Sequence, residues 1–242
     1  SFESENDGPV LIDDIEIYTK VAPRPTASIG REWVDTWVRM GGPLGGIGYD
    51  IRMRPDNPDI MYVSDAVAGV HMSTDGGQTW FPTNEGIDIR AGESGDAIPV
   101  FSLTIDPHNP DILWIGTQAQ LGIYKSIDGG QTWQLKDNGA VEKDITFRGF
   151  TVDPRSSDII YAAAEVSSWE WTEDGQELMG VAFDRTMGVV YRTQDGGEHW
   201  EEFWRGNNLA RYVWVNPQDP NVIYISTGIF DREAANSDPV SR

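Results

Sequence analysis

Acidic side chains are the groups in this chain best suited to chemistry. The chain has 242 residues, with 39 Asp or Glu against 18 Lys or Arg and no cysteine. Four polar residues directly follow short apolar runs and would begin loops: Asp65, Gln118, Glu165 and Asp231. Two carboxylates at a defined separation can cleave a glycosidic bond, and several together can ligate Ca²⁺. No spacing here specifies a metal site, so we expect no metal and no cofactor, and we predict Gln118, Glu165 and Asp231 as ligand-binding residues.

Two tryptophans form a second candidate site. Trp169 and Trp171 are two residues apart, so they share one face if the segment is extended. Exposed indoles can form a flat platform for sugar rings or a hot spot for a protein partner. A hairpin whose tryptophans pack onto the protein is an equally good interpretation. We predict both as ligand-binding residues.

The elements that position these groups repeat along the chain. A turn phrase occurs three times, as STDGGQTW (73–80), SIDGGQTW (126–133) and TQDGGEHW (193–200). A proline phrase precedes each copy, at 54–62, 106–114 and 153–161, and a fourth copy stands at 216–224. Self-similarity at a period near fifty residues indicates a repeat architecture. The longer third unit predicts an insertion between Glu165 and Met187.

Each unit contains four short strand patterns. In the second unit, 100–105 alternates with period two, 112–115 is continuously apolar, 122–126 is a third run, and the segment at Trp133 begins a fourth. No comparable stretch has a sustained helical pattern. Four strands per fifty residues describe one antiparallel blade of an all-β propeller.

The turn phrases have a structural explanation. Glycine adopts positive φ without a Cβ clash, Asp accepts hydrogen bonds from nearby amides, and the Trp can pack between blades. We therefore predict a structural role for the following residues: Ser73, Asp75, Gly77, Thr79, Trp80, Ser126, Asp128, Gly130, Thr132, Trp133, Thr193, Asp195, Gly197 and Trp200.

The loops after the second and fourth strands of a propeller blade open on one face, and the turn phrases lie on the opposite face. The four loop-initial residues should therefore meet around the axis, so we expect an acidic mouth there. The loops after the fourth strands add Glu93, Asp96, Asp144, Arg205 and Asn207.

The repeats predict about three and a half blades, too few to close a ring of the usual four to eight. A half ring would leave an unpaired sheet edge, which soluble proteins avoid. We therefore expect a partial ring of seven or more blades, completed by the remainder of a longer chain or by another chain. The expected parts are an N-terminal arm or linker (1–32), a ring-closing strand with a Gly-rich segment (33–48), blades at 49–83, 100–136 and 148–203 (insertion 165–187), and an incomplete blade at 211–242.

The turn phrase resembles the Asp box, or bacterial neuraminidase repeat, S/T-x-D-x-G-x-T-W. Two copies match fully and the third departs only at His199. Propellers with this motif include sialidases, xyloglucanase-type glycoside hydrolases, sortilin-like receptors and YCF48-like photosystem II assembly factors. The resemblance covers about Trp33 to the end and implies the fold, whereas the functions of these families differ.

A narrower resemblance involves one carboxylate. Segments 37–48, 54–55 and 62–69 resemble the opening blade of the xyloglucanase-type family, in which a Thr-Asp-x-Gly-Gly stretch supplies the general base. This resemblance implies Asp65 as a catalytic residue. Here the Asp lies one residue nearer the tyrosine and Ala68 replaces a glycine, and that family's general acid comes from a second propeller. The alternative is a loop carboxylate that binds backbone amides.

Several function classes are disfavoured. The net charge of −21 argues against nonspecific binding to nucleic acid or to anionic membranes. The sequence contains no run of eighteen apolar residues, so it predicts no membrane span. A sialidase needs an Arg-Ile-Pro motif, which is missing, and an acidic face would repel an anionic sugar. His71, His108 and His199 occupy strand or turn positions without a Gly-x-Ser-x-Gly elbow, which disfavours a Ser-His-Asp hydrolase.

We therefore predict an exported propeller, extracellular, periplasmic or at the cell surface, that binds a glycan or protein partner and is not catalytic on this chain. The first alternative is a glycoside hydrolase with Asp65 as one of two catalytic carboxylates. The second is a sortilin- or YCF48-like propeller that binds a peptide at its central tunnel.

Overall fold

The structure, a computed structural model, describes residues 42–43, 48–118, 122–140, 142, 145–166, 187–206 and 209–228. Residues Arg39–Arg242 form one compact unit, which contains the fourteen strands of the described ranges. The predicted arm at 1–32, most of the ring-closing segment, and Trp169, Trp171 and Asp231 lie outside the described residues. Within the described ranges, no helix has the length and apolar character needed to cross a membrane.

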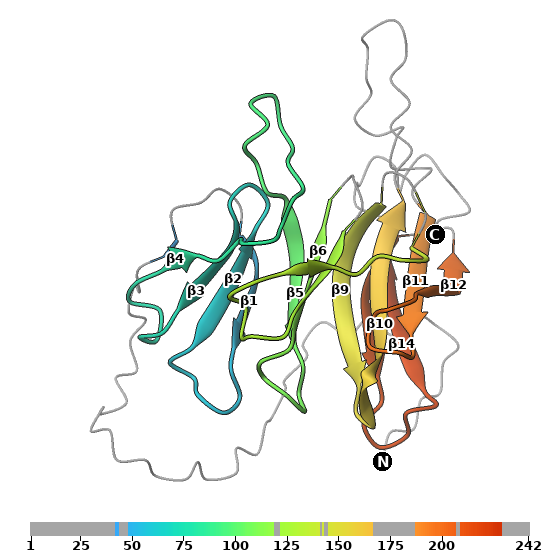
Figure 1. Cartoon of the computed structure of the whole chain (residues 1–242). Coiled ribbons are helices and arrows are strands. Elements are labelled where there is room, and N and C mark those ends of the chain that lie inside the picture. Colours follow the sequence, from blue (N-terminus) through green and yellow to red (C-terminus); the bar gives the residue numbers. More distant parts are fainter. Residues whose placement is uncertain are drawn as a thin grey trace, which may run out of the picture. The chain divides into compact units, whose positions relative to one another are not determined.

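The described chain forms three four-stranded antiparallel sheets and one two-stranded sheet, with the strands of each sheet in sequence order (Figure 1). The first sheet contains β1 (Gly48–Met53), β2 (Met61–Asp65), β3 (Gly69–Ser73) and β4 (Phe81–Pro82). The second contains β5 (Val100–Ile105), β6 (Leu113–Thr117), β7 (Ile123–Ser126) and β8 (Gln134–Leu135). The third contains β9 (Ile145–Asp153), β10 (Ser156–Val166), β11 (Met187–Thr193) and β12 (Glu201–Gly206). The fourth contains β13 (Leu209–Val215) and β14 (Ile223–Gly228). These sheets confirm the partial propeller, three blades and half of a fourth.

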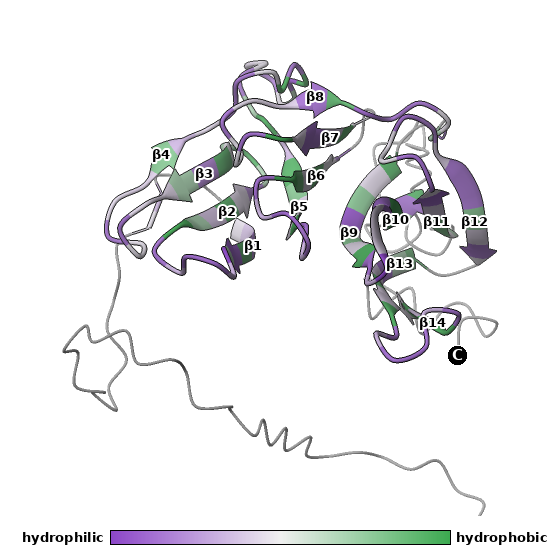
Figure 2. Ribbon diagram, turned by 60° about the horizontal axis from the view of Figure 1, so that its bottom comes forward, coloured by the Kyte–Doolittle hydropathy of each residue, from purple (hydrophilic) through white to green (hydrophobic). Residues whose placement is uncertain are grey.

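The sheets fan out from their first strands. In Figure 2, β1, β5, β9 and β13 lie on the inner side of the fan, and β4, β8 and β12 on the outer side. The apolar core fills the spaces between successive sheets: Tyr62 and Val70 of the first sheet pack with Leu113 and Trp133 of the second. β5 does not show the burial alternation that its sequence predicts, because Val100–Leu103 are buried on both faces between neighbouring sheets.

Each turn phrase closes a hairpin through its aspartate. In the first copy, Asp75 Oδ1 accepts hydrogen bonds from the Gln78 and Thr79 amides at 2.9 Å each, and Oδ2 accepts from Thr79 Oγ1 at 2.7 Å. Gly77 has a φ of 87°, a conformation that favours glycine. The second copy repeats this network around Asp128. In the third copy, His199 stands where the other copies have threonine and donates only its backbone amide to Asp195. The hydrogen bond from a threonine hydroxyl at this position is therefore lost.

The two repeated phrases meet at one end of each sheet. The carbonyl of Asp59, in the proline phrase, accepts a hydrogen bond from the amide of Gly76, in the turn phrase, at 2.9 Å. Asp111 and Asp158 make the corresponding bonds to Gly129 and Gly196 in the next two sheets. The repetition of both phrases therefore reflects one local contact, made once per blade.

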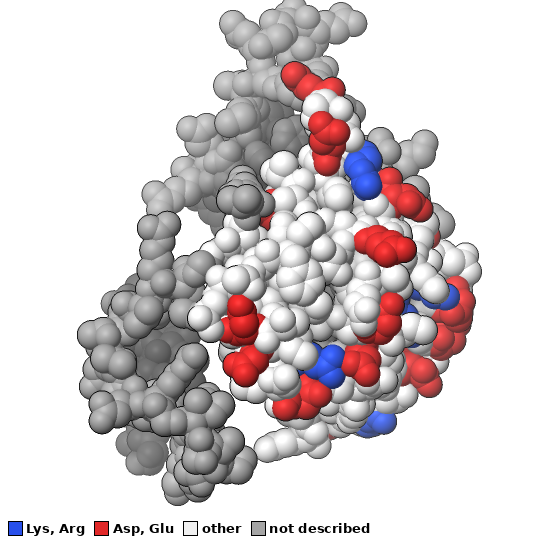
Figure 3. Space-filling model, turned by 60° about the vertical axis from the view of Figure 1, so that its left-hand side comes forward, with Lys and Arg blue, Asp and Glu red and all other residues white. Residues whose placement is uncertain are grey.

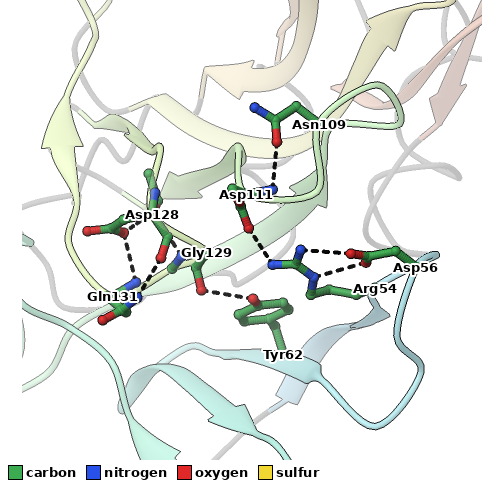
Figure 4. Close-up of polar contacts among 10 residues, drawn as sticks. Arg54, Asp56, Tyr62, Asn109, Asp111, Asp128, Gly129 and Gln131 are labelled. Carbon is green, nitrogen blue, oxygen red and sulfur yellow. Dashed lines mark hydrogen bonds and ion pairs between the residues drawn. The ribbon is translucent and has the colours of Figure 1, made fainter.

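The same phrases also connect neighbouring blades (Figure 4). The Tyr62 hydroxyl of the first sheet donates to the Gly129 carbonyl of the second at 2.8 Å. Arg54 lies between Asp56 of its own loop and Asp111 of the next blade, 2.6 Å from Asp111 Oδ1. These contacts fix the relative position of the first two sheets.

The tryptophans of the second and third turn phrases reach the preceding blade. Trp133 Nε1 donates to the Thr83 carbonyl of the first blade at 2.8 Å, and Trp200 Nε1 donates to the Lys136 carbonyl of the second at 2.7 Å. Trp80 differs, because its Nε1 donates to Gly77 of its own hairpin at 3.0 Å.

Acid is expected to weaken the hairpins through these aspartates. The Thr79 hydroxyl, together with the Thr79, Ser73 and Gln78 donors, lowers the pKa of Asp75 from 3.8 to about 2. Because the unfolded chain takes up this proton first, the stabilisation is complete above pH 4 and is lost as the pH falls towards 2. Urea unfolding between pH 5 and 2 should show a falling midpoint. Thr79→Val should raise the pKa of Asp75 and so narrow the pH range over which the midpoint falls. If the midpoint of Asp75→Asn falls with acid as much as that of the wild type, the assignment is contradicted.

Candidate functional site

Asp65, the predicted catalytic residue, ends β2 and lies in the turn to β3. Asp65 is 3% exposed, and its Oδ1 accepts hydrogen bonds from the backbone amides of Val67 at 2.7 Å and Ala68 at 2.9 Å. A short carboxylate that bonds amides two and three residues ahead stabilises a turn. The neighbouring His71 is buried, and this burial lowers its pKa, although the Asp65 carboxylate opposes the shift.

Gln118 and Glu165 make their contacts within their own sheets. Gln118 is half-buried, and its backbone amide donates to the Pro99 carbonyl at 3.1 Å. Glu165 lies on β10 and forms an ion pair with Arg148 of β9, in which the side chains are 7% and 10% exposed. The three described candidates are therefore anchored separately, on the first, second and third sheets.

A pocket that sequence reasoning missed lies among the innermost strands, and we call it the axial pocket. It has a cavity volume of about 70 Å³. Its lining comes from the first strand of each of the four sheets: Tyr49 and Asp50 of β1, Phe101 of β5, Arg148 of β9, and Arg211 and Tyr212 of β13.

The axial pocket combines aromatic rings with charged groups. The Tyr49 and Phe101 ring centroids are 4.3 Å apart, and the Arg148 guanidinium lies 5.0 Å from the Phe101 centroid. Asp50 Oδ1 pairs with Arg52 at 2.9 Å, while Oδ2 accepts a hydrogen bond from the Leu103 amide at 3.0 Å. The sequence predicted an acidic mouth, yet the lining contains two arginines and one aspartate. The predicted mouth consists of loop residues that do not line this pocket, so the acidic mouth stays a prediction.

The pocket residues share one sequence feature. The first strand of each unit contributes to the pocket, through Tyr49, Phe101, Arg148 and Arg211. A side-by-side comparison of the four first strands would therefore have grouped these residues. Polar residues that begin loops, the signal most visible in the sequence, do not select these strand positions. No group of three or more metal-ligating His, Asp or Glu side chains occurs in the part of the chain that the structure describes.

Sequence comparisons identify the repeat. The BNR/Asp-box repeat family model matches residues 71–82 and 124–135, the first two turn phrases. The chain is similar to xyloglucanase Xgh74A of Acetivibrio thermocellus, with 26% identity over 166 residues, covering 58% of this chain and 17% of that protein. It is 25% identical over 97 residues to the oligoxyloglucan-reducing end-specific xyloglucanase of Emericella nidulans, covering 40% of this chain and 12% of that protein. The chain thus spans less than a fifth of the length of these relatives.

Solved structures agree on the fold. An ancestral GH74 enzyme superposes with a TM-score of 0.56 at 20% identity, covering 80% of this chain and 24% of that one. YCF48 bound to D1 peptide gives a TM-score of 0.49 at 16% identity, covering 74% of this chain and 47% of that one. The expected resemblance to Asp-box propellers is confirmed by the family model and by the fold of the ancestral GH74 enzyme.

Proposed function

We propose that this chain is an exported β-propeller module that binds a glycan at the axial pocket and does not itself catalyse hydrolysis. The observation that carries the proposal is the pocket, where aromatic and hydrogen-bonding side chains of four blades meet. Aromatic faces pack against the apolar faces of sugar rings, while charged groups orient hydroxyls. The curated relatives that the chain matches are xyloglucanases, which favours a glycan over a protein partner.

The environment of Asp65 supports a binding role over a catalytic one. A catalytic carboxylate must reach the reacting atoms, whereas the Asp65 residue is 3% exposed and its Oδ1 bonds two amides of its own turn. Hydrolysis with Asp65 as one carboxylate is the second candidate function, and the similarity to xyloglucanases favours it.

Binding can be tested by retardation of the chain in native gels that contain xyloglucan or polygalacturonate. We expect at least one polysaccharide to retard the protein. Tyr212→Ala should weaken binding about tenfold or more, because alanine substitution of a stacking aromatic at a binding site commonly costs that much. The matched control is Tyr224→Ala, since both tyrosines are similarly exposed, at 56% and 54%, but Tyr224 does not line the pocket.

Catalysis is tested separately by the release of reducing ends from xyloglucan. The wild type should release none above background. Hydrolysis that Asp65→Asn abolishes would favour the second candidate, and asparagine keeps a carbonyl oxygen for the two turn amides, so the variant should fold. In the gel test, retardation of both tyrosine variants to the same extent as the wild type would contradict binding at the pocket. A wild type that neither polysaccharide retards would contradict it as well.

A further inference from the structure

We infer that two copies of this chain bind each other head to tail, through exposed apolar surfaces on the first and the fourth sheets. The rear surface consists of Ile51 and Met53 on β1. The front surface consists of Trp214 on β13 and Tyr224 on β14. The inference goes beyond the proposed glycan binding, and it follows from what the corresponding residues of the other blades contact.

The front surface corresponds to a position that is buried in each earlier blade. Tyr224 ends the fourth proline phrase, and the residues that end the first three are Tyr62, Trp114 and Tyr161. These three are at most 4% exposed, because they pack in the cores between their own sheet and the following one. Tyr224 is 54% exposed and Trp214 is 51% exposed, and their ring centroids are 5.5 Å apart. The front surface is therefore the side of a blade that receives a following blade.

The rear surface shows the same relation in the opposite direction. Ile51 and Met53 lie four and two residues before the proline of their phrase, and they are 57% and 59% exposed. The corresponding residues of the later sheets are buried or half-buried and pack with apolar residues of the preceding sheet: Leu103 and Ile105, Phe150 and Val152, and Val213 and Val215. The rear surface is therefore the side of a blade that receives a preceding blade.

The turn phrases supply a polar part of each contact between blades. The carbonyl of Gly129, in the second turn phrase, accepts a hydrogen bond from the Tyr62 hydroxyl of the first blade at 2.8 Å. The carbonyl of Gly196, in the third turn phrase, accepts one from Lys125 Nζ of the second blade at 2.9 Å. The corresponding glycine of the first turn phrase is Gly76. A blade that packs on the rear surface can therefore donate to the Gly76 carbonyl.

Both surfaces belong to one chain, so two copies can complete each other. When the front surface of each copy packs on the rear surface of the other, the same contact forms twice. A head-to-tail contact whose rotation closes gives a finite ring. In it, Tyr224 of one copy takes the place of Tyr62 and donates to Gly76 of the second copy. Two copies would together have eight sheets, the upper end of the range usual in propellers.

The charge of the chain requires this contact to be apolar. Each copy has a net charge of −21, and Figure 3 shows more acidic than basic side chains on the face that it presents. Two copies therefore repel each other at low ionic strength. The four side chains of the two surfaces carry no charge, and the burial of their apolar area favours association. Salt should accordingly strengthen the dimer, because it screens the repulsion between the copies.

Sedimentation velocity of the 242-residue chain over a concentration series from about 1 to 100 µM tests the inference. We expect a monomer–dimer equilibrium, which raising NaCl from about 50 to 500 mM shifts towards the dimer. Trp214→Asp and Ile51→Asp should each raise the dissociation constant about tenfold or more, because each buries an unpaired carboxylate in both contacts. The matched control is Ile127→Asp, at a residue that is 65% exposed in the second turn phrase and belongs to neither surface. It should leave the dissociation constant unchanged.

A mixture of the two variants shows whether the contact is head to tail. Each variant keeps one intact surface, so an equimolar mixture of Trp214→Asp and Ile51→Asp can form one unaltered contact. The mixture should therefore associate more tightly than either variant alone. A mixture that associates no more tightly, or a dimer that folded Ile51→Asp leaves unchanged, overturns the inference.

The wild type alone can also overturn it. A chain that stays monomeric at the highest concentration would show that a different partner covers the two surfaces. Growth beyond the dimer would show that the contact does not close. These outcomes do not depend on whether a variant folds. They also leave the proposed glycan binding intact, because none of the four surface residues lines the axial pocket.

Discussion

Replacing Gly139 by alanine should lower the free energy of unfolding by about 3 kcal/mol, from backbone strain and overpacking together. Gly139 has a φ of 96°, and a Cβ there would lie 2.0 Å from the carbonyl oxygen of Trp200. This atom belongs to the backbone of the next blade and cannot swing aside. Relief would require the segment to move away from Trp200, whose amide and indole nitrogen donate to Asn138 and Lys136 at 2.7 Å each.

The matched control is Gly95→Ala. Gly95 also has a positive φ, 71°, but no atom lies within 4 Å of a Cβ built there. Only the strain of the left-handed conformation remains, about 1 kcal/mol. Urea unfolding followed by tryptophan fluorescence measures both. Equal losses in the two variants would show that contact between blades adds nothing to the requirement for glycine at 139.

Gly86 repeats the arrangement one blade earlier. It has a φ of 87°, and a Cβ would lie 2.0 Å from the carbonyl oxygen of Trp133. Gly86→Ala should therefore behave like Gly139→Ala. The two glycines recur at corresponding places in two units. The blades could be recognised from sequence because the hydrogen bonds within each turn phrase are local and depend on particular residue types.

The candidate site was much less predictable. Its residues come from four units far apart in sequence and differ in type, from Tyr49 to Phe101, Arg148 and Arg211. No repeated phrase marks them, because each unit contributes a different side chain to the axis. Burial was not predictable either, since Asp65 and Glu165 follow apolar runs at expected loop starts yet are buried in the structure. Their partners, two backbone amides and Arg148, depend on the folded geometry.

The Arg148–Glu165 ion pair should be among the most sensitive polar contacts of the described chain. Removing one partner of a buried ion pair leaves an uncompensated charge, which typically costs about 3–5 kcal/mol. We therefore expect Glu165→Gln to lower the free energy of unfolding by about 3 kcal/mol, the lower end of that range, because glutamine can still accept one hydrogen bond. The exposed pair of Arg192 and Glu201 gives the control, and Glu201→Gln should cost about 1 kcal/mol or less.

A double variant separates the structural role of Glu165 from the ligand-binding role that the sequence suggested. Arg148→Met combined with Glu165→Leu removes both charges and fills similar volume, so it should be less destabilised than either single variant. It should nevertheless be retarded less than the wild type in the polysaccharide gels, because the guanidinium that lines the axial pocket is gone. If Glu165→Gln stays within 1 kcal/mol of the wild type in urea yet loses ligand affinity, Glu165 acts on the ligand directly. The ion pair would then not be what holds β9 and β10 in position at the axis.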